Sequence, residues 1–298
     1  MAPVIPEEHP PNNTHAGQQT MPLTPNESLT NKFKKENTQW KKTFRSLISI
    51  LDGTEELKDA FKYNLFTHDI VCQRDISIAG AKIKKGKCLD DTDVIHIRAW
   101  LSIEFDYETG TANISDGAEH VAGRSSYHPV RDWLDSLTWD QTPRLDLWLQ
   151  LAAGVKDDAY TRAVARKTLT AAVARIYEPG TKFDYMLILE GKQGIGKSTL
   201  CRVLGGEWFA SLSLTDRDKD IIDCMRGAWI IENAELSSFK RENDMNWLNA
   251  FLSRETDRVR LSYARRSKDF PRQSIFFGTY NPRGENDYFR ALPGHSNL

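Results

Sequence analysis

The sequence has few of the features that assign a protein to a structural class directly. Its 4 cysteines are spread over 298 residues and form no C-x-x-C pair. This spread suits neither a zinc knuckle nor a disulfide framework, so a reducing compartment is expected. No apolar run approaches the ~20 residues that span a bilayer, and the N-terminus lacks the basic and apolar segments of a signal peptide. We therefore expect a cytoplasmic protein without membrane contact.

A large charge of one sign is also absent. Lys and Arg number 40, Asp and Glu number 41, and the formal net charge is −1. This balance excludes a wholly basic nucleic-acid coat and an acidic disordered chain, so any nucleic-acid surface has to be local. Hydrophobic residues make up 40% of the chain, which is enough for a sizeable core. The length favours two domains over one large one.

Composition and pattern divide the chain into four segments. Six of the 12 prolines fall between Pro3 and Pro25, which predicts a disordered arm over residues 1–29. Residues 30–125 are predicted to be a mainly helical accessory region, 126–180 a helical lead-in segment and 181–298 an α/β core. Within the accessory region we expect helices over 40–51, 55–63 and 93–105, a strand over 69–72, a basic turn over 83–87 and a linker over 110–126. The basic turn suits a phosphate backbone, although lysines on a turn are more often only solvated.

The strongest motif follows an apolar run over residues 185–190, which suits a buried parallel strand. Gly191 to Ser198 read G-K-Q-G-I-G-K-S and fit the P-loop pattern G-x-x-x-x-G-K-[S/T], with apolar residues at helical spacing after it. Glycines let main-chain N–H groups surround phosphate oxygens, and the helix N-terminus adds partial positive charge. Lys197 is expected to reach the β- and γ-phosphates and Ser198 to ligate Mg²⁺. The expected nucleotide-binding residues are Gly191, Gly194, Ile195, Gly196, Lys197, Ser198 and Thr199.

A P-loop enzyme also needs an acidic group at the tip of a neighbouring strand. The apolar run over residues 228–231 ends in Glu232, and Glu235 follows three residues later. We assign Glu232 to the Mg²⁺ side and Glu235 to the general base, although the roles can be exchanged and one of the two can be a surface charge. A further apolar run over residues 274–280 ends in Asn281, whose amide can position a water molecule or serve only the turn Asn281–Pro282.

A basic segment lies between these last two runs. Residues 254–272 hold seven Lys or Arg against three Asp or Glu, in a chain of almost no net charge. Val259, Leu261 and Tyr263 alternate with polar neighbours, which predicts a hairpin strand. A basic hairpin with an interleaved aromatic suits a nucleic-acid backbone. A solvated hairpin or a subunit contact is the alternative.

These motifs, in this order, resemble the virulence-associated protein E family, whose members are phage- and island-encoded P-loop proteins similar to superfamily 3 replicative helicases. The resemblance is dense over about residues 126–287 and looser over residues 40–125. The matching residues outside the P-loop and the two glutamates are His128-Pro129-Val130-Arg131, Trp139-Asp140, Pro143-Arg144, Arg226-Gly227, Phe251-Leu252-Ser253, Pro271-Arg272 and Gly278-Thr279 with Asn281. Thr181 departs from the pattern, because the family often has cysteine there.

The resemblance implies an α/β fold: a P-loop NTPase core with a helicase-type parallel sheet and flanking helices, preceded by a mainly helical region. It implies ATP and Mg²⁺ as cofactors, with Ser198 and Glu232 as metal ligands. It also implies a homo-oligomeric ring around single-stranded or forked DNA, with ATP at the subunit interfaces. The implied catalytic residues are Lys197, Glu232, Glu235 and Asn281. The implied DNA contacts are Arg258, Arg260, Arg265, Arg266 and Lys268. Larger relatives carry a primase module upstream, and we expect no primase activity here.

The leading functional hypothesis is a DNA-dependent, helicase-like ATPase that serves replication of a phage or integrated element. The alternative is a regulatory or interaction protein that binds nucleotide and DNA with little or no turnover. A small-molecule kinase would leave the basic hairpin unexplained. Relatives continue after the asparagine into a Gly-Asn-Arg-Arg-Phe-Trp segment, whereas here only Arg283 and Arg290 follow Asn281. We therefore expect slow hydrolysis and poor ring formation, unless a partner supplies an arginine.

Overall fold

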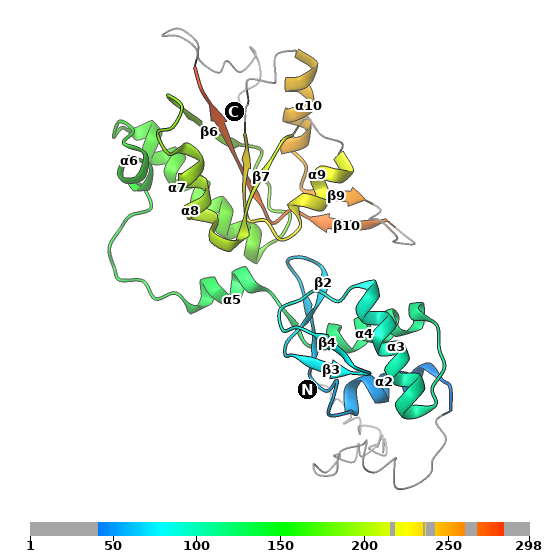
Figure 1. Ribbon diagram of the computed structural model, residues 1–298. Coiled ribbons are helices and arrows are strands. Elements are labelled where there is room, and N and C mark those ends of the chain that lie inside the picture. The colour runs from blue at the N-terminus through cyan, green and yellow to red at the C-terminus, as the bar shows by residue number, and fades with distance from the viewer. Residues whose placement is uncertain (1–40, 215–217, 235, 237–241, 260–266, 283–298) are drawn as a thin grey trace, which may run out of the picture.

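The structure is a computed structural model that describes residues 41–282, except for residues 215–217, 235, 237–241 and 260–266 (Figure 1). The predicted arm over residues 1–29 lies outside the described residues. The same holds for eight residues singled out in the sequence, which are Glu235, Arg260, Leu261, Tyr263, Arg265, Arg266, Arg283 and Arg290. No helix of the described part is long and apolar enough to cross a membrane.

The N-terminal region combines helices with two small sheets. Its helices are α2 (Phe44–Gly53), α3 (Asp91–Phe105) and α4 (Thr111–Gly123). Its strands are β1 (Phe61–Asn64), β2 (Asp69–Cys72), β3 (Ile76–Ile78), β4 (Ala81–Ile83) and β5 (Ser126–Tyr127). Strand β1 pairs antiparallel with β2 and parallel with β5, while β3 and β4 form a hairpin. The predicted helices over 40–51 and 93–105 and the strand over 69–72 are confirmed.

Two predictions for this region are wrong. Residues 55–63 are not a helix, because the chain turns and then enters β1, where Phe61 is buried and pairs with Cys72. Residues 110–126 are not a linker but hold α4. Gly117, one of the glycines in this stretch, allows α4 to pack closely on α2. A Cβ at Gly117 would lie 3.1 Å from Leu51 Cδ1 of α2. The region is therefore mixed α and β, and not only helical.

The lead-in segment has the predicted helical character. Helices α5 (Pro129–Ser136), α6 (Trp148–Ala153) and α7 (Ala159–Tyr177) follow one another along it. Helix α7 begins at a capping box in which Asp158 and Thr161 each bond the other's main-chain N–H. Such a box satisfies N–H groups that the first helical turn leaves without partners. The indole of Trp148 anchors α6 on α7 by donating to the carbonyl of Ala165 at 2.9 Å.

The core is a parallel sheet of four strands with helices on both faces (Figure 1). The strands are β6 (Met186–Glu190), β7 (Phe209–Leu212), β8 (Ile230–Asn233) and β11 (Ile275–Tyr280), in the order β6-β11-β8-β7. The remaining elements are α8 (Lys197–Gly205), η1 (Gly206–Trp208), α9 (Asp218–Met225), α10 (Glu242–Leu252) and the hairpin strands β9 (Thr256–Val259) and β10 (Lys268–Pro271). This confirms the predicted α/β class with a parallel sheet.

Side chains that alternate between the two faces of β11 pack into the two halves of the core, one on each side of the sheet. Phe277 packs with residues of α7 and α8, whereas Phe276 packs with residues of α9 and α10. Neighbouring residues of a strand point to opposite faces, so an unbroken apolar run suits a strand that is covered on both sides. The register pairs Tyr280 with Glu190 and Gly278 with Asn233. The carboxyl ends of β6, β11 and β8 therefore meet at one edge of the sheet.

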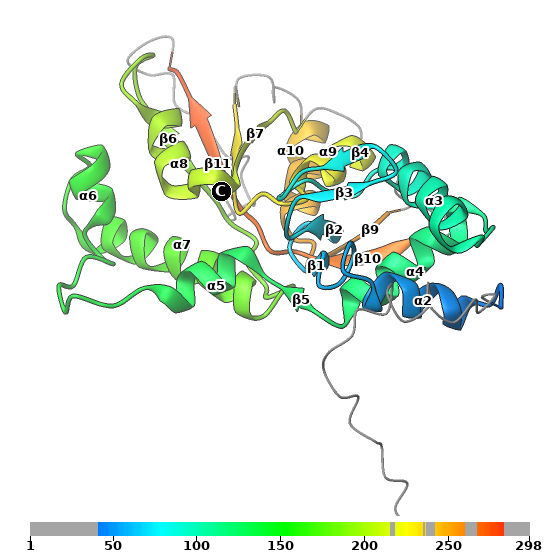
Figure 2. The same cartoon turned by 60° about the horizontal axis from the view of Figure 1, so that its bottom comes forward.

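The N-terminal region lies beside the β9–β10 hairpin (Figure 2). The Arg226 guanidinium, just after α9, donates to the carbonyl of Thr67 and forms an ion pair of 2.6 Å with Asp69. The His68 ring meets the Phe270 ring of β10 edge-on at 5.0 Å between centroids. A buried bond of 2.6 Å joins His128 Nε2 to Gln273 Oε1. These contacts fix the region against the base of the hairpin.

Candidate nucleotide site

The loop between β6 and α8, residues 191–196, is called the glycine loop here. Its first residue, Gly191, has φ +155°, and a Cβ there would lie 2.5 Å from Cδ1 at the flexible end of the Ile195 side chain, which folds back over it. Gly196 has φ +96° and is the N-cap of α8, with no side-chain hydrogen bond to the helix end. The first N–H groups of α8 therefore have no side-chain cap. Such a helix end is a favourable place for an anion.

Lys197, the first residue of α8, holds the mouth of the loop together. Its ammonium donates to the carbonyl oxygens of Gly191 at 2.7 Å and Lys192 at 2.9 Å. The third donor bond, of 2.7 Å, goes to Asn281 Oδ1 at the end of β11. Burial lowers the pKa of Lys197, while the charge of Glu232 opposes that shift. The structure thus brings together Lys197 and Asn281, which the sequence placed in one site.

Glu232 lies inside β8 and is 2% exposed. Its Oε1 accepts a bond of 2.5 Å from the Ser198 hydroxyl and one of 3.1 Å from the Thr279 hydroxyl. The sequence predicted Glu232 at the exit of the strand, but the strand runs one residue further, to Asn233. The reason is pairing, since both residues align with β11 and β7. Glu232 is therefore held by hydroxyl groups and shielded from water.

Thr279 is a site residue that the sequence reading missed. It belongs to β11 two positions before Asn281, and alternation puts side chains two apart on the same face of a strand. That spacing is the signal that could have identified it. The side chain of Thr199 is exposed in the first turn of α8, and Ile195 is 61% exposed.

The side-chain oxygen atoms of this site are ligands of the kind that Mg²⁺ prefers. Ser198 Oγ and a Glu232 carboxylate oxygen lie within hydrogen-bonding distance of each other, and Mg²⁺ prefers hard oxygen ligands, taking one or two carboxylates together with substrate phosphates. Within the described ranges no group of three or more His, Cys, Asp or Glu could hold a metal ion. Protein side chains alone thus supply only part of a coordination shell at this edge.

The basic hairpin is present, and its described charges are paired. Strands β9 and β10 are antiparallel, with Asp269 opposite Arg258 and an ion pair of 3.6 Å between them. The Lys268 ammonium lies 3.4 Å from Glu119 of α4. At the base of the hairpin the Arg272 guanidinium binds Asp257 through two bonds of 2.7 and 2.9 Å, with both side chains buried. The hairpin is thus anchored just before β11, the strand that leads to Asn281.

Comparison with known proteins gives a matching sequence family and similar solved structures, two of which are described here. The sequence model of the virulence-associated protein E-like domain matches residues 134–294. Two apo structures of the NrS-1 C-terminal region resemble the chain, with TM-scores of 0.42 and 0.40 and 14% identity each. They cover 81% and 79% of this chain, and the matched parts are 58% and 56% of those chains. The chain thus spans little more than half the length of these solved structures. No curated protein matches the sequence.

Proposed function

The chain belongs to the family of virulence-associated protein E-like domains, and on that premise we propose that it is a DNA-dependent, helicase-like ATPase in the replication of a phage or integrated element. The observation that carries the proposal is the meeting of three strand ends. Lys197 after β6 contacts Asn281 after β11, and Ser198 contacts Glu232 on β8. In open α/β sheets, ligands bind in the crevice outside the carboxyl ends of the strands.

We propose that the glycine loop and α8 bind the triphosphate of ATP. The uncapped N–H groups of α8 and the main chain of the loop would surround the phosphate oxygens. The Lys197 ammonium would exchange its three protein acceptors for β- and γ-phosphate oxygens. The exchange is favourable because charged acceptors form stronger bonds with an ammonium than carbonyl and amide oxygens do. Asn281, released from Lys197, would then face the γ-phosphate.

Ser198 and Glu232 are the proposed ligands of Mg²⁺. When bound there, Mg²⁺ would neutralise charge that develops on the β- and γ-phosphate oxygens. The Ser198 hydroxyl donates its hydrogen bond to Glu232. When Mg²⁺ binds, this hydroxyl would rotate so that a lone pair of Ser198 Oγ is available to the ion. Thr279 would remain on Glu232 and keep its carboxylate oriented. Glu235 is the proposed base that takes the proton of the attacking water, as that water bonds to the γ-phosphorus and the bond to the bridging oxygen breaks.

The DNA-binding part of the proposal rests on the hairpin. Arg258 and Lys268 lie on its two strands with exposed side chains, and each is paired with an exposed carboxylate. Such pairs are weak in water, so phosphates can replace the carboxylates at small cost. Arg260, Arg265 and Arg266 are proposed to add to this surface. A homo-oligomeric ring around DNA, with ATP between subunits, remains part of the proposal.

Turnover of ATP with and without single-stranded DNA tests the proposal. The wild type should bind Mg-ATP, and DNA should stimulate hydrolysis. Lys197→Ala should lower hydrolysis by about 10²-fold or more, because it removes a positive charge that faces the transition state. Lys167→Ala, which removes an exposed lysine of α7, is the control and should behave as wild type. Wild-type turnover by Lys197→Ala would remove the glycine loop from the mechanism. Binding of ATP and DNA without turnover would favour the regulatory alternative.

A further inference from the structure

The N-terminal region carries a cluster of lysines that the proposed function does not use. Residues 76–87, called the lysine hairpin here, read I-S-I-A-G-A-K-I-K-K-G-K and hold four lysines and no acidic residue. Strands β3 and β4 form the two arms of this hairpin, and the basic turn predicted over residues 83–87 begins at the end of β4. The lysine hairpin lies apart from the four-stranded sheet (Figure 1), so it belongs neither to the nucleotide site nor to the β9–β10 hairpin.

The lysine hairpin has an apolar inner face and a polar outer face. Its isoleucines are buried in the core of the N-terminal region and are Ile76, Ile78 and Ile83. Neighbouring residues of a strand point to opposite faces, and Lys82 on β4 and Ser77, which pairs with it on β3, are both exposed. Ala79 and Gly80 join the strands with φ +46° and +79°. Two-residue turns with positive φ are the tight turns of β-hairpins, so the lysines extend from a short support that is anchored in the core.

Three of the four lysines are available to an outside partner. Lys87 is not, because its ammonium lies 2.8 and 2.9 Å from two carboxylates at the start of α3. Lys84 lies 3.3 Å from Asp75, and both side chains are more than 60% exposed. Such a pair is weak in water, so another anion can replace the carboxylate. Lys82 and Lys85 are exposed, and neither takes part in an ion pair with another described residue.

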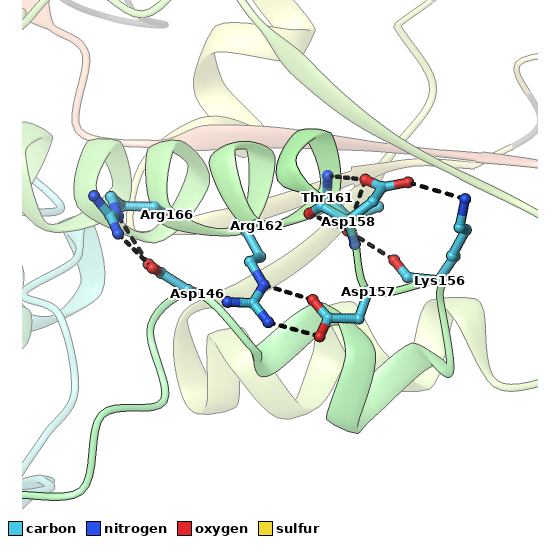
Figure 3. A network of polar contacts seen from close by, with 7 residues as sticks. All are labelled: Asp146, Lys156, Asp157, Asp158, Thr161, Arg162 and Arg166. Carbon is cyan, nitrogen blue, oxygen red and sulfur yellow. Dashed lines mark hydrogen bonds and ion pairs between the residues drawn. The ribbon is translucent and has the colours of Figure 1, made fainter.

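The basic residues at the start of α7 show the opposite arrangement (Figure 3). Arg162 binds Asp157 through two bonds of 2.6 and 2.7 Å. Arg166, one turn further along α7, binds both carboxylate oxygens of Asp146, just before α6. Each guanidinium is matched by a carboxylate of the same chain, so this network offers little net charge to an outside anion. The lysine hairpin differs because its outer lysines outnumber the carboxylates beside them.

We propose that the lysine hairpin binds the sugar-phosphate backbone of duplex DNA. The inference rests on the proposed function, because DNA is the polyanion on which the proposed ATPase acts. Residues 74–87 contain no aromatic residue, whereas sites for a single strand combine cations with aromatic side chains on which the bases stack. A duplex keeps its bases stacked and presents phosphates, which lysines bind without reading sequence. The small residues at the tip of the hairpin let its main chain come close to such a backbone.

Binding of a blunt duplex of about 20 base pairs, and of one of its strands alone, is measured between about 50 and 200 mM salt. Lys82→Ala, Lys84→Ala and Lys85→Ala are combined in one variant. For the duplex, the slope of log affinity against log salt should become shallower by about 2–3, because each lost phosphate contact contributes ~0.9, and affinity should fall about tenfold or more. Affinity for the single strand should not change. Lys82→Arg, Lys84→Arg and Lys85→Arg keep the charge and should keep the slope.

A second triple variant controls for net charge. Lys156→Ala, Lys167→Ala and Lys182→Ala together remove the same charge from exposed lysines outside the N-terminal region. This variant should leave the slopes for the duplex and for the single strand unchanged. If both triple variants shift the duplex slope equally, the effect is one of net charge, and the inference is wrong.

The remaining outcomes separate the inference from the proposed function. An alanine variant of the lysine hairpin that binds the duplex with the wild-type slope would overturn the inference. The proposed function would then still stand, provided that single-stranded DNA stimulates ATP hydrolysis by the wild type. Equal losses for the duplex and the single strand would contradict the assignment to duplex DNA. A wild type that binds neither DNA would overturn both proposals. Unchanged duplex binding with lost binding of polyglutamate would assign the lysine hairpin to an acidic protein, against the inference.

Discussion

Glu232 is a buried carboxylate that contacts two hydroxyl groups. Its Oε1 accepts the hydroxyl hydrogen bonds of Ser198 and Thr279. The charge has an effect on its neighbours. Cys201, buried on α8, has a pKa raised to about 12, first by burial and then by Glu232. A negative charge held at this position is suited to a metal ion and unsuited to an apolar core.

The substitution Glu232→Gln keeps the shape of this side chain and removes its charge. We expect turnover to fall by about 10²-fold or more, because a neutral amide is a poorer ligand for Mg²⁺ than a carboxylate and the ion would stabilise charge in the transition state. Thermal stability should change little, because the amide still accepts the two hydroxyl bonds. Steady-state ATPase rates and melting curves measure the two effects. Glu207→Gln, at an exposed glutamate of η1, is the control. Turnover that survives Glu232→Gln would assign the acidic role to Glu235 alone.

The elements that the sequence predicted best are those that carry their own local signal. Strands β6 and β11 and the start of β8 lie in apolar runs, and the helix after the glycine loop has a loop glycine as its N-cap. The elements it missed depend on distant partners. Strand β1 pairs with the distant β5 as well as with the adjacent β2, and Gly117 of α4 packs on the distant α2. The partners β5 and α2 lie outside the local sequence, so composition alone suggested a helix and a linker.

The candidate site shows the same division. Lys197, Ser198, Glu232 and Asn281 were predicted because each lies at or after the end of an apolar run, and the structure brings Lys197 to Asn281 and Ser198 to Glu232. The order of the strands could not be predicted. Strand β11 lies between β6 and β8, and only this order puts Thr279 beside Glu232. A threonine within an apolar run gives no local sign of such a role.

The base of the hairpin gives a prediction for one element. Arg272 and Asp257 are both buried, and the guanidinium also lies 4.3 Å from the centre of the Phe251 ring. Asp257→Asn leaves a buried charge without its counter-ion and should lower the free energy of unfolding by about 3 kcal/mol. Asp269→Asn breaks the exposed pair with Arg258 and should cost less than about 1 kcal/mol. Urea unfolding measures both. Equal effects would show that the buried pair does not anchor the hairpin.

The contact between the N-terminal region and the core should make stability depend on pH. His68 and His128 both lie at this contact, and burial is the main cause that lowers the pKa of each.

A neutral histidine in the folded state contributes its full stability above the unfolded pKa of ~6.5. That stability is lost as the pH falls toward the lower folded pKa. We therefore expect the free energy of unfolding to fall as the pH drops below about 6.5. His128→Gln should reduce this fall, with His120→Gln as the exposed control. Urea titrations at each pH measure it, and a pH-independent wild type would contradict it.

The same contact connects the N-terminal region to the proposed DNA surface. Helix α4 presents Glu119 to Lys268 of β10 at 3.4 Å, and both side chains are more than half exposed. If Lys268 binds a DNA phosphate, it has to leave Glu119 first. Glu119→Gln removes this competitor, so DNA affinity should rise. The slope of log affinity against log salt should become steeper by up to about 0.7–0.9, the value for one additional phosphate contact.

A double-mutant cycle makes the last test specific to this pair. Asp116→Asn removes the same charge from an exposed position of α4 and should leave the salt slope unchanged. Lys268→Ala should make the slope shallower and should also abolish the effect of Glu119→Gln, since the two residues act through one contact. Equal gains from Glu119→Gln and Asp116→Asn would reduce the effect to net charge. A slope that none of the three substitutions moves would place the DNA surface away from the hairpin.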